Sequence, residues 1–242
     1  MKITNYRLGI IGGMGPQASA LLHTLVLDKY AKELGAVKTN DYPLILHISV
    51  PVIDFISDPE AIQKNNSLFD LASRLIDDAQ LDSCIIACNT VNLVTDSNPS
   101  LNRLPLISLP KSVIAEAKAQ KVKKLGLIAS PSTIRTKLYE QYAEPEGIQI
   151  IALGEVLSGR VEKIIRATIA GKTGKTEISE LNALAKDLIR RGAEAIALGC
   201  TELSVIAHRG RLRYPYIDSL TAAVNSLLKD IREKQETKNG KR

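Results

Sequence analysis

Short apolar runs alternate with longer amphipathic stretches along almost the whole chain. The runs are rich in Ile, Leu and Val, as in strands buried on both faces, and the longer stretches space their apolar residues as helices do. These patterns predict strands over residues 6–11, 44–50, 83–87, 104–109, 125–129, 149–153, 195–198 and 216–218. They predict helices over residues 18–34, 61–80, 112–120, 133–142, 156–170, 177–191 and 221–232. Such alternation indicates an α/β protein with parallel sheets covered by helices on both faces.

The two halves of the chain share one pattern. Each half opens with a strand that ends in small or polar residues, at 12–15 and at 130–133. Each half later has an apolar strand followed by a cysteine and a threonine. We therefore expect two pseudo-symmetric lobes, each a parallel sheet flanked by helices, with the active site in the cleft between them.

The lobe boundaries follow from the proline pattern and the last helix. Three prolines fall within residues 98–110, which favours a hinge there. We expect the C-terminal helix to pack back onto the first half. The first lobe would then comprise residues 1–103 plus 215–242, and the second lobe residues 104–214.

Two cysteines, Cys88 and Cys200, occupy matching positions in the two halves. Each follows an apolar strand and precedes polar residues of the types that cap helices. At such a place the free N–H groups and the helix dipole favour a thiolate. A single cysteine there would most simply be a buried small residue, but the matched pair favours catalysis. Cys84 begins its strand, away from the expected cleft, and is interpreted as a core residue.

Two opposed thiols are suited to racemisation without a cofactor. One thiolate removes a proton from a carbon, and the other thiol returns a proton on the opposite face. Asn89, Thr90 and Thr201 follow the cysteines, and their side chains and N–H groups can bind a substrate carboxylate. The sequence therefore predicts a small-molecule substrate that carries a carboxylate and an acidic Cα proton.

Composition and charge exclude several other classes. The 242 residues are 45% hydrophobic and 24% charged, which is ordinary for a globular protein. The net charge of +6 lies largely in residues 121–124 and 229–242, which we interpret as solvated segments. With 4% aromatic residues and no Trp, we expect no nucleic-acid partner. The apolar stretch at residues 8–13 is too short for a signal peptide or a membrane span, so we expect no membrane association.

The cysteine count and the remaining motifs set the expected location and cofactors. Three cysteines do not form a disulfide framework, and free thiols fit a reducing, cytoplasmic location. Residues 9–15 do not match the dinucleotide loop, and neither Gly-Lys-Thr triplet has the earlier glycine of a phosphate loop. The three histidines have no metal-ligand spacing. We expect neither a cofactor nor a metal.

Three segments together resemble the aspartate/glutamate racemase family, in particular its aspartate racemase-like branch. They are Gly-Gly-Met-Gly-Pro at residues 12–16, Cys-Asn-Thr at 88–90 and Leu-Gly-Cys-Thr-Glu-Leu at 198–203. The resemblance covers nearly the whole chain. It implies two pseudo-symmetric lobes, no pyridoxal phosphate, no metal and a homodimer.

The resemblance also assigns roles to residues of this chain. It implies that Cys88 and Cys200 are the acid/base pair. It implies that Asn89, Thr90, Thr133 and Thr201 bind the α-carboxylate and amino group, with Ser132 beside them. Met14 and Gln17 would line the site from the first loop, and Glu202 would be a polar neighbour of the second thiol.

The chain departs from the family pattern where a side-chain carboxylate would bind. It has no arginine in residues 49–56, and Ile169 and Ala170 stand where a lysine often precedes the glycine. Val91 and Asn92 replace an Ala-His pair, and Gln17 replaces a glutamate. We therefore predict an isomerase, specifically an amino-acid racemase of broad or non-acidic specificity.

Two alternatives remain at this stage. One is a related decarboxylase or cis–trans isomerase of the same superfamily. Such relatives can use a single cysteine, so the presence of both Cys88 and Cys200 argues against a decarboxylase in particular. The other is a non-catalytic module that binds an amino acid or carboxylate. Racemisation without pyridoxal phosphate would distinguish the racemase from both.

Overall fold

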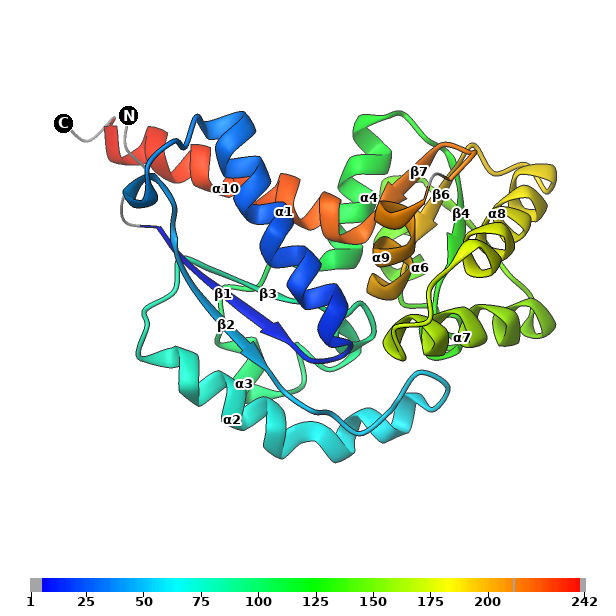
Figure 1. Cartoon of the computed structure of the whole chain (residues 1–242), viewed down its shortest axis with the longest axis horizontal. Coiled ribbons are helices and arrows are strands. Elements are labelled where there is room, and N and C mark those ends of the chain that lie inside the picture. Colours follow the sequence, from blue (N-terminus) through cyan, green and yellow to red (C-terminus); the bar gives the residue numbers. More distant parts are fainter. Residues whose placement is uncertain (1–5, 211, 240–242) are drawn as a thin grey trace.

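The computed structural model describes residues 6–210 and 212–239, and it contains two parallel sheets (Figure 1). The first sheet has the strand order β2-β1-β3, formed by β1 (Arg7–Gly12), β2 (Leu44–Ser49) and β3 (Ser83–Ile86). The second has the order β5-β4-β6-β7, formed by β4 (Lys124–Ile128), β5 (Gln149–Ala152), β6 (Ala195–Leu198) and β7 (Tyr216–Asp218). The predicted α/β class with two parallel sheets flanked by helices is confirmed.

The two sheets follow the same winding, which is the structural basis of the repeat in the sequence. In each sheet the first strand along the chain is flanked by the second and the third, and a cysteine follows the third. Outside β3, the predicted strand 104–109 is reduced to a single parallel bridge between Leu106 and Cys84. Pro105 has no N–H, so it takes part in this bridge only by accepting from Cys84, and Ser108 is already the N-cap of the next helix. Strand pairing therefore ends after two hydrogen bonds.

Helices cover both faces of the sheets (Figure 1). The α-helices are α1 (Pro16–Leu34), α2 (Asn66–Asp77), α3 (Pro99–Asn102), α4 (Leu109–Ala119), α5 (Pro131–Arg135), α6 (Glu140–Ala143), α7 (Glu155–Ile169), α8 (Lys175–Arg190), α9 (Thr201–Arg209) and α10 (Ser219–Asn239). Short 3-10 turns are η1 (Thr39–Asp41), η2 (Pro59–Asn65), η3 (Thr90–Leu93) and η4 (Glu144–Glu146).

Two predicted helices are interrupted, each for a local reason. The helix expected over residues 61–80 divides into η2 and α2, because buried Asn65 turns its amide to the backbone of Ile53. The helix expected over residues 133–142 divides into α5 and α6, because Lys137 has a φ of 50°, which no helix accommodates.

The core of the first lobe lies on both faces of its sheet, because successive strand residues point to opposite sides. Leu8 and Ile10 of β1 pack with α1 and α10, in a cluster that includes Leu22 and Leu227. Ile11 packs on the other face with Phe69 of α2 and with Cys84. The second sheet is sandwiched in the same way, by α7, α8 and α9 on one face and by α4 and α6 on the other.

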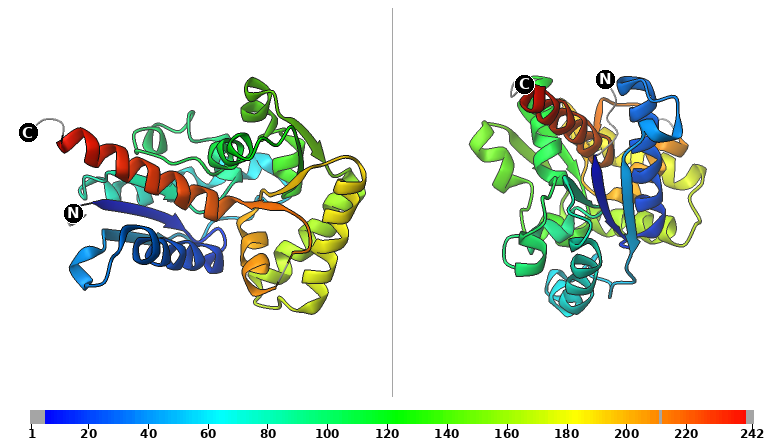
Figure 2. Two further views of the ribbon diagram at one scale, coloured as in Figure 1. Left: turned by 90° about the horizontal axis from the view of Figure 1, so that it is seen from above. Right: turned by 90° about the vertical axis from the view of Figure 1, so that its left-hand side faces the viewer.

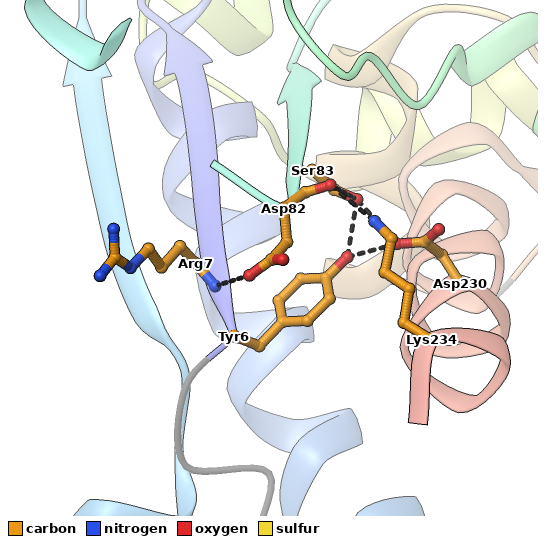
Figure 3. Close-up of polar contacts among 6 residues, drawn as sticks. All are labelled: Tyr6, Arg7, Asp82, Ser83, Asp230 and Lys234. Carbon is orange, nitrogen blue, oxygen red and sulfur yellow. Dashed lines mark hydrogen bonds and ion pairs between the residues drawn. The ribbon is translucent and has the colours of Figure 1, made fainter. Parts of the chain in front are cut away.

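The C-terminal helix α10 packs against α1 of the first lobe and against α4, which covers the second sheet (Figure 2). A polar cluster fixes its far end to β1 and β3 (Figure 3). The Tyr6 hydroxyl donates to Asp230 and lies 2.6 Å from the Ser83 hydroxyl, which itself donates to Asp230. Lys234 donates to Asp230 and to the Asp82 carbonyl. These contacts join the end of α10 to the start of the first sheet.

The segment 215–242, predicted to belong to the first lobe, contributes to both lobes in the part that is described. Its strand β7 pairs with β6 and so belongs to the second sheet. Its helix α10 packs against α1 of the predicted first lobe and against α4, which lies in the predicted second lobe. Residues 1–5, 211 and 240–242 of the predicted lobes lie outside the described residues, and the lobe boundaries themselves stay a prediction.

Candidate active site

Cys88 and Cys200 lie just beyond the carboxyl ends of equivalent strands, β3 and β6. Both are free thiols and both are buried, with exposed fractions of 5% and 9%. They are close enough that a negative charge on Cys88 adds to the rise in the pKa of Cys200. The structure thus brings the two predicted catalytic thiols together between the lobes, whereas Cys84 lies wholly inside the first lobe.

Cys200 has a carboxylate partner. Its Sγ donates to Glu202 Oε2 at 2.9 Å, and the other carboxylate oxygen, Oε1, accepts the Gly15 N–H at 2.9 Å. The Thr201 hydroxyl lies 3.3 Å from both Glu202 Oε2 and the Ala87 carbonyl across the cleft. Glu202 is therefore held between the Cys200 thiol and the first loop of the opposite lobe.

Burial is the largest influence on these two groups. It raises the pKa of the Cys200 thiol well above its usual value, and the nearby Glu202 carboxylate raises this pKa further. Burial also raises the pKa of Glu202, although the hydrogen bonds that it accepts oppose this rise. Both groups therefore favour their protonated forms more than they would in water.

Gly15 allows the Glu202 carboxylate to reach the first loop. A Cβ at this position would lie 2.8 Å from Glu202 Oε1 and 3.3 Å from Ile169. Any side chain here would displace the carboxylate or the end of α7. The glycine in the Met-Gly-Pro motif is thus explained by a close approach between the lobes.

Cys88 has a different environment, made of backbone donors. Burial raises the pKa of its thiol to about 12, while the N–H groups of Val91 and Thr90 in η3 act in the opposite direction. The charge of Glu202 contributes to the rise as well. Cys88 thus has backbone donors at two residues of η3 for its ionised form, whereas Cys200 has one, the Glu202 N–H, and also faces the Glu202 carboxylate.

Three hydroxyls form a buried cluster that joins the lobes. Thr90 Oγ1 lies 3.0 Å from Thr133 Oγ1 and 3.2 Å from Ser130 Oγ, and Ser130 donates to Thr133 at 3.0 Å. Thr90 and Thr133 were predicted from the sequence, whereas Ser130 was missed. Its signal was present, since Ser130 precedes Pro131 and caps α5. Such a cluster can donate several hydrogen bonds to a carboxylate.

The other predicted binding residues have structural partners. Asn89 accepts from the Tyr139 hydroxyl at 2.7 Å and donates to Ser219, so both ends of its amide are engaged. The Ser132 hydroxyl donates to the Phe55 carbonyl at 2.6 Å and does not join the hydroxyl cluster. The hydrogen bond between Ser132 and Phe55 therefore joins the two lobes next to the hydroxyl cluster, and Ser132 is not a member of that cluster.

The first loop supplies the last two predicted residues. Met14 is buried in the same apolar cluster as Cys88. The Gln17 side chain donates to the Ile169 carbonyl at the end of α7, 3.0 Å away. Met14 thus belongs to the apolar surroundings of Cys88, and Gln17 holds the two lobes together.

A cavity of about 330 Å³ lies against this loop. Its walls come from residues 13–16 of the first loop, residues 52–56 after β2, and the C-terminal part of α7. Neither cysteine lines it, but Gly15 in its wall donates to Glu202, the partner of Cys200, and Met14 in its wall belongs to the same apolar cluster as Cys88. The cavity is thus connected to the surroundings of both thiols through the first loop.

The segment after β2 is attached to the second lobe over this region. Besides the Ser132 contact, the Ser132 N–H donates to the Ile56 carbonyl, and Arg135 donates to the Ser57 carbonyl. Asp54 forms an ion pair with Arg166 of α7. Residues 54–57 therefore act as an interlobe latch, and we use this name for them below.

Metal ligands and membrane-spanning helices can be considered for residues 6–210 and 212–239, which the structure describes. Within this part of the chain, no group of three or more His, Cys, Asp and Glu residues is arranged to hold a metal ion. No described helix combines the length and the hydrophobicity that crossing a bilayer requires.

The model of the Asp/Glu/Hydantoin racemase family matches residues 11–227, most of the chain. The chain belongs to this family. Its members with similar sequences include a broad-specificity amino-acid racemase of Bacillus subtilis (strain 168), which is 22% identical over 90% of this chain and 95% of its own length. A glutamate racemase of Shewanella sp. (strain MR-4) is also 22% identical, but the match covers only 63% of this chain and 58% of the relative.

Solved structures of this racemase family show the same fold. The aspartate racemase of Picrophilus torridus superposes with a TM-score of 0.76 at 20% identity, covering 93% of this chain and 94% of that one. The superposition confirms the predicted two-lobe architecture, and family membership confirms the predicted isomerase class.

Proposed function

We propose that this protein racemises an amino acid without a cofactor, using Cys88 and Cys200 as the two bases. The observation that carries this proposal is the placement of two buried thiols at equivalent strand ends, where the hydroxyl of Thr201, next to Cys200, lies 3.3 Å from the carbonyl of Ala87, next to Cys88. Family membership supports the reaction class. The thiols come from opposite lobes, as a reaction on two faces of one carbon requires.

The substrate carboxylate would bind at the hydroxyl cluster. Thr90, Ser130 and Thr133 are buried and converge from both lobes, so their hydroxyls can turn toward a carboxylate. A carboxylate held there is fixed relative to both strand ends. The Cα then lies between the thiols, and the substrate ammonium supplies a positive charge that favours a nearby thiolate.

The two thiols would start in different protonation states. Cys88 ionises first, because backbone N–H groups stabilise its thiolate, whereas Glu202 disfavours a thiolate at Cys200. The Cys88 thiolate removes the Cα proton, and the Cys200 thiol donates its proton to the opposite face of the planar carbanion. The reverse reaction exchanges these roles.

Glu202 would position and assist the Cys200 thiol. Its Oε2 accepts the S–H at 2.9 Å, which fixes the direction of the sulfur. After Cys200 has given up its proton, a thiolate and a carboxylate would be adjacent and buried. The raised pKa of Glu202 allows the carboxyl group to take up a proton at that stage and relieve the repulsion.

Assembly and location belong to the same proposal. We infer a reducing, cytoplasmic setting, because all three cysteines are free and the mechanism needs two of them reduced. We also propose the homodimer that the resemblance to the racemase family implies. Sedimentation of the purified protein, with and without reductant, measures both the oligomer and its dependence on free thiols.

The experiment that tests the proposal is racemisation by single cysteine variants. Without pyridoxal phosphate, the wild-type protein should produce D-amino acid from a panel of L-amino acids, measured by chiral chromatography. Cys88→Ala and Cys200→Ala should each lower the rate by about 10³-fold or more, because each removes one of the two bases.

The matched control is Cys84→Ala, which removes the other buried thiol of the first lobe. Cys84 lies at the start of β3, as its second residue. This variant should lower stability and leave the rate per folded molecule unchanged. Full activity in either Cys88→Ala or Cys200→Ala would show that two bases are not used. Binding of an amino acid by the wild-type protein without racemisation would identify a binding module instead.

A further inference from the structure

The cavity beside the first loop has mainly apolar walls. Its lining includes the side chains of Met14, Val52, Phe55, Ile56 and Ile169, together with Gly13, Gly15, Pro16 and Ala170. The charged residues in its lining are Asp54 and Arg166. A space of about 330 Å³ with such walls is suited to an apolar group.

The position of the cavity relates it to the substrate. Gly15 lines the cavity and donates its N–H to Glu202, which accepts from Cys200, while Met14 lines the cavity and belongs to the same apolar cluster as Cys88. The hydroxyl cluster would hold the α-carboxylate, and the two thiols would flank the Cα. The side chain is then the remaining substituent to be accommodated, and the cavity is the space next to it.

The charges at the cavity do not favour a carboxylate. Arg166 is the cation in the lining, and it already pairs with Asp54 and, at 2.8 Å, with Glu162. Within the lining Asp54 and Arg166 balance each other, and Glu162, the second partner of Arg166, lies outside the lining, so no cation is left in excess there. An acidic side chain in the cavity would have to compete with both of these partners for Arg166.

Two helix ends of opposite sign meet at the cavity: the amino end of α1, at Gly15 and Pro16, carries a positive partial charge, and the carboxyl end of α7 carries a negative one. Arg166, Ile169 and Ala170 line the cavity from the C-terminal end of this 15-residue helix. The carbonyls at a helix C-terminus carry a negative partial charge, which repels anions. Gln17 satisfies the Ile169 carbonyl but does not reverse the direction of the helix dipole.

From these observations we propose that the cavity receives a neutral, apolar side chain. The substrates are then amino acids of the type of leucine, methionine and phenylalanine rather than aspartate and glutamate. This inference rests on the proposed racemase function and specifies its substrate class.

The test measures Cα exchange by the wild-type protein in heavy water. Proton NMR follows the loss of the Cα–H signal from L-leucine, L-methionine and L-phenylalanine, and from L-aspartate and L-glutamate. We expect kcat/KM for the best apolar substrate to exceed that for either acidic one by about tenfold or more. Equal or faster exchange of an acidic substrate would overturn the substrate class and leave the racemase intact. No exchange with any of the five would overturn both proposals.

A variant tests the charge argument directly. Asp54→Asn removes one carboxylate partner of Arg166, so the ratio of acidic to apolar kcat/KM should rise by about fivefold. The matched control is Asp187→Asn, which removes the carboxylate of the exposed Asp187–Arg191 ion pair on α8 and should leave the ratio unchanged. A ratio that does not rise in Asp54→Asn, or that rises equally in both variants, would contradict the proposed role of the cavity charges.

Discussion

At the scale of the residue, the two thiols differ more than the symmetry of the lobes implies. Cys88 is near backbone donors, and Cys200 donates to Glu202. The repeat in the sequence therefore places two equivalent sulfurs, while their neighbours give them different acidities. Such a difference assigns one thiol as the initial base and the other as the initial acid in the proposed mechanism.

A prediction follows for the acidity of Cys200. Glu202→Gln removes a neighbouring negative charge and an acceptor that stabilises the protonated thiol. Both changes favour the thiolate, so the pKa of Cys200 should fall, by about one unit or more. The measurement is a titration of ultraviolet thiolate absorbance in the Cys84→Ala, Cys88→Ser background, in which Cys200 is the remaining cysteine.

The control for this titration is Glu60→Gln in the same background, because Glu60 is an exposed glutamate of η2. It should leave the titration midpoint where it was. A Glu202→Gln midpoint that stays unchanged or moves to higher pH would show that Glu202 does not hold Cys200 protonated.

At the scale of the element, the C-terminal helix owes its position to a few polar contacts as well as to its apolar face. Leu220, Val224 and Leu227 pack into the first core, and the cluster around Asp230 fixes the far end (Figure 3). The Tyr6 ring also lies 5.5 Å from the Lys234 ammonium. The cluster lies near the amino ends of β1 and β3, whereas the thiols lie beyond the carboxyl ends of β3 and β6.

The element-scale prediction concerns Tyr6→Phe. The change deletes the hydroxyl that meets Asp230 and Ser83 and keeps the ring, so it should lower the free energy of unfolding by about 1–3 kcal/mol. Urea unfolding measures this loss. Tyr216→Phe is the control, because Tyr216 is 39% exposed and should change stability little. Equal losses in the two variants would contradict an anchoring role for the Tyr6 hydroxyl.

At the scale of the whole molecule, the lobes are joined around the thiols. The contacts of Gly15 with Glu202, Gln17 with Ile169, and Tyr139 with Asn89 all cross from one lobe to the other. The interlobe latch adds further contacts over the same region. The arrangement keeps bulk water away from both sulfurs, which have exposed fractions below a tenth.

The sequence predicted the strands and the paired cysteines because these depend on local patterns. Buried parallel strands are continuous apolar runs, and Cys88 and Cys200 repeat in the same local context. Features that depend on tertiary contacts were not predictable. The interruption at Asn65 depends on the loop at Ile53, and the pairing of β7 with β6 depends on where the chain returns.

The binding residues show the same limit. Ser132 and Thr133 are adjacent and both polar. The Thr133 hydroxyl belongs to the hydroxyl cluster, whereas the Ser132 hydroxyl donates to Phe55 of the interlobe latch. Their directions are set by the turn at the start of α5, which the composition of the segment does not reveal. Likewise, the pairing of Arg166 with Asp54 joins residues more than a hundred positions apart.

The most direct test of the central claim is the isotope content of substrate and product early in the reaction in heavy water. A thiol carries one exchangeable proton, so two thiols on opposite faces deliver solvent deuterium to the product enantiomer while the remaining substrate keeps its protium. We predict, for the best substrate, product that is almost fully deuterated at Cα and substrate that is almost unlabelled, as measured by chiral separation with mass spectrometry. Product that retains the substrate proton, or substrate that gains deuterium as fast as product forms, would contradict a mechanism with Cys88 and Cys200 as separate bases.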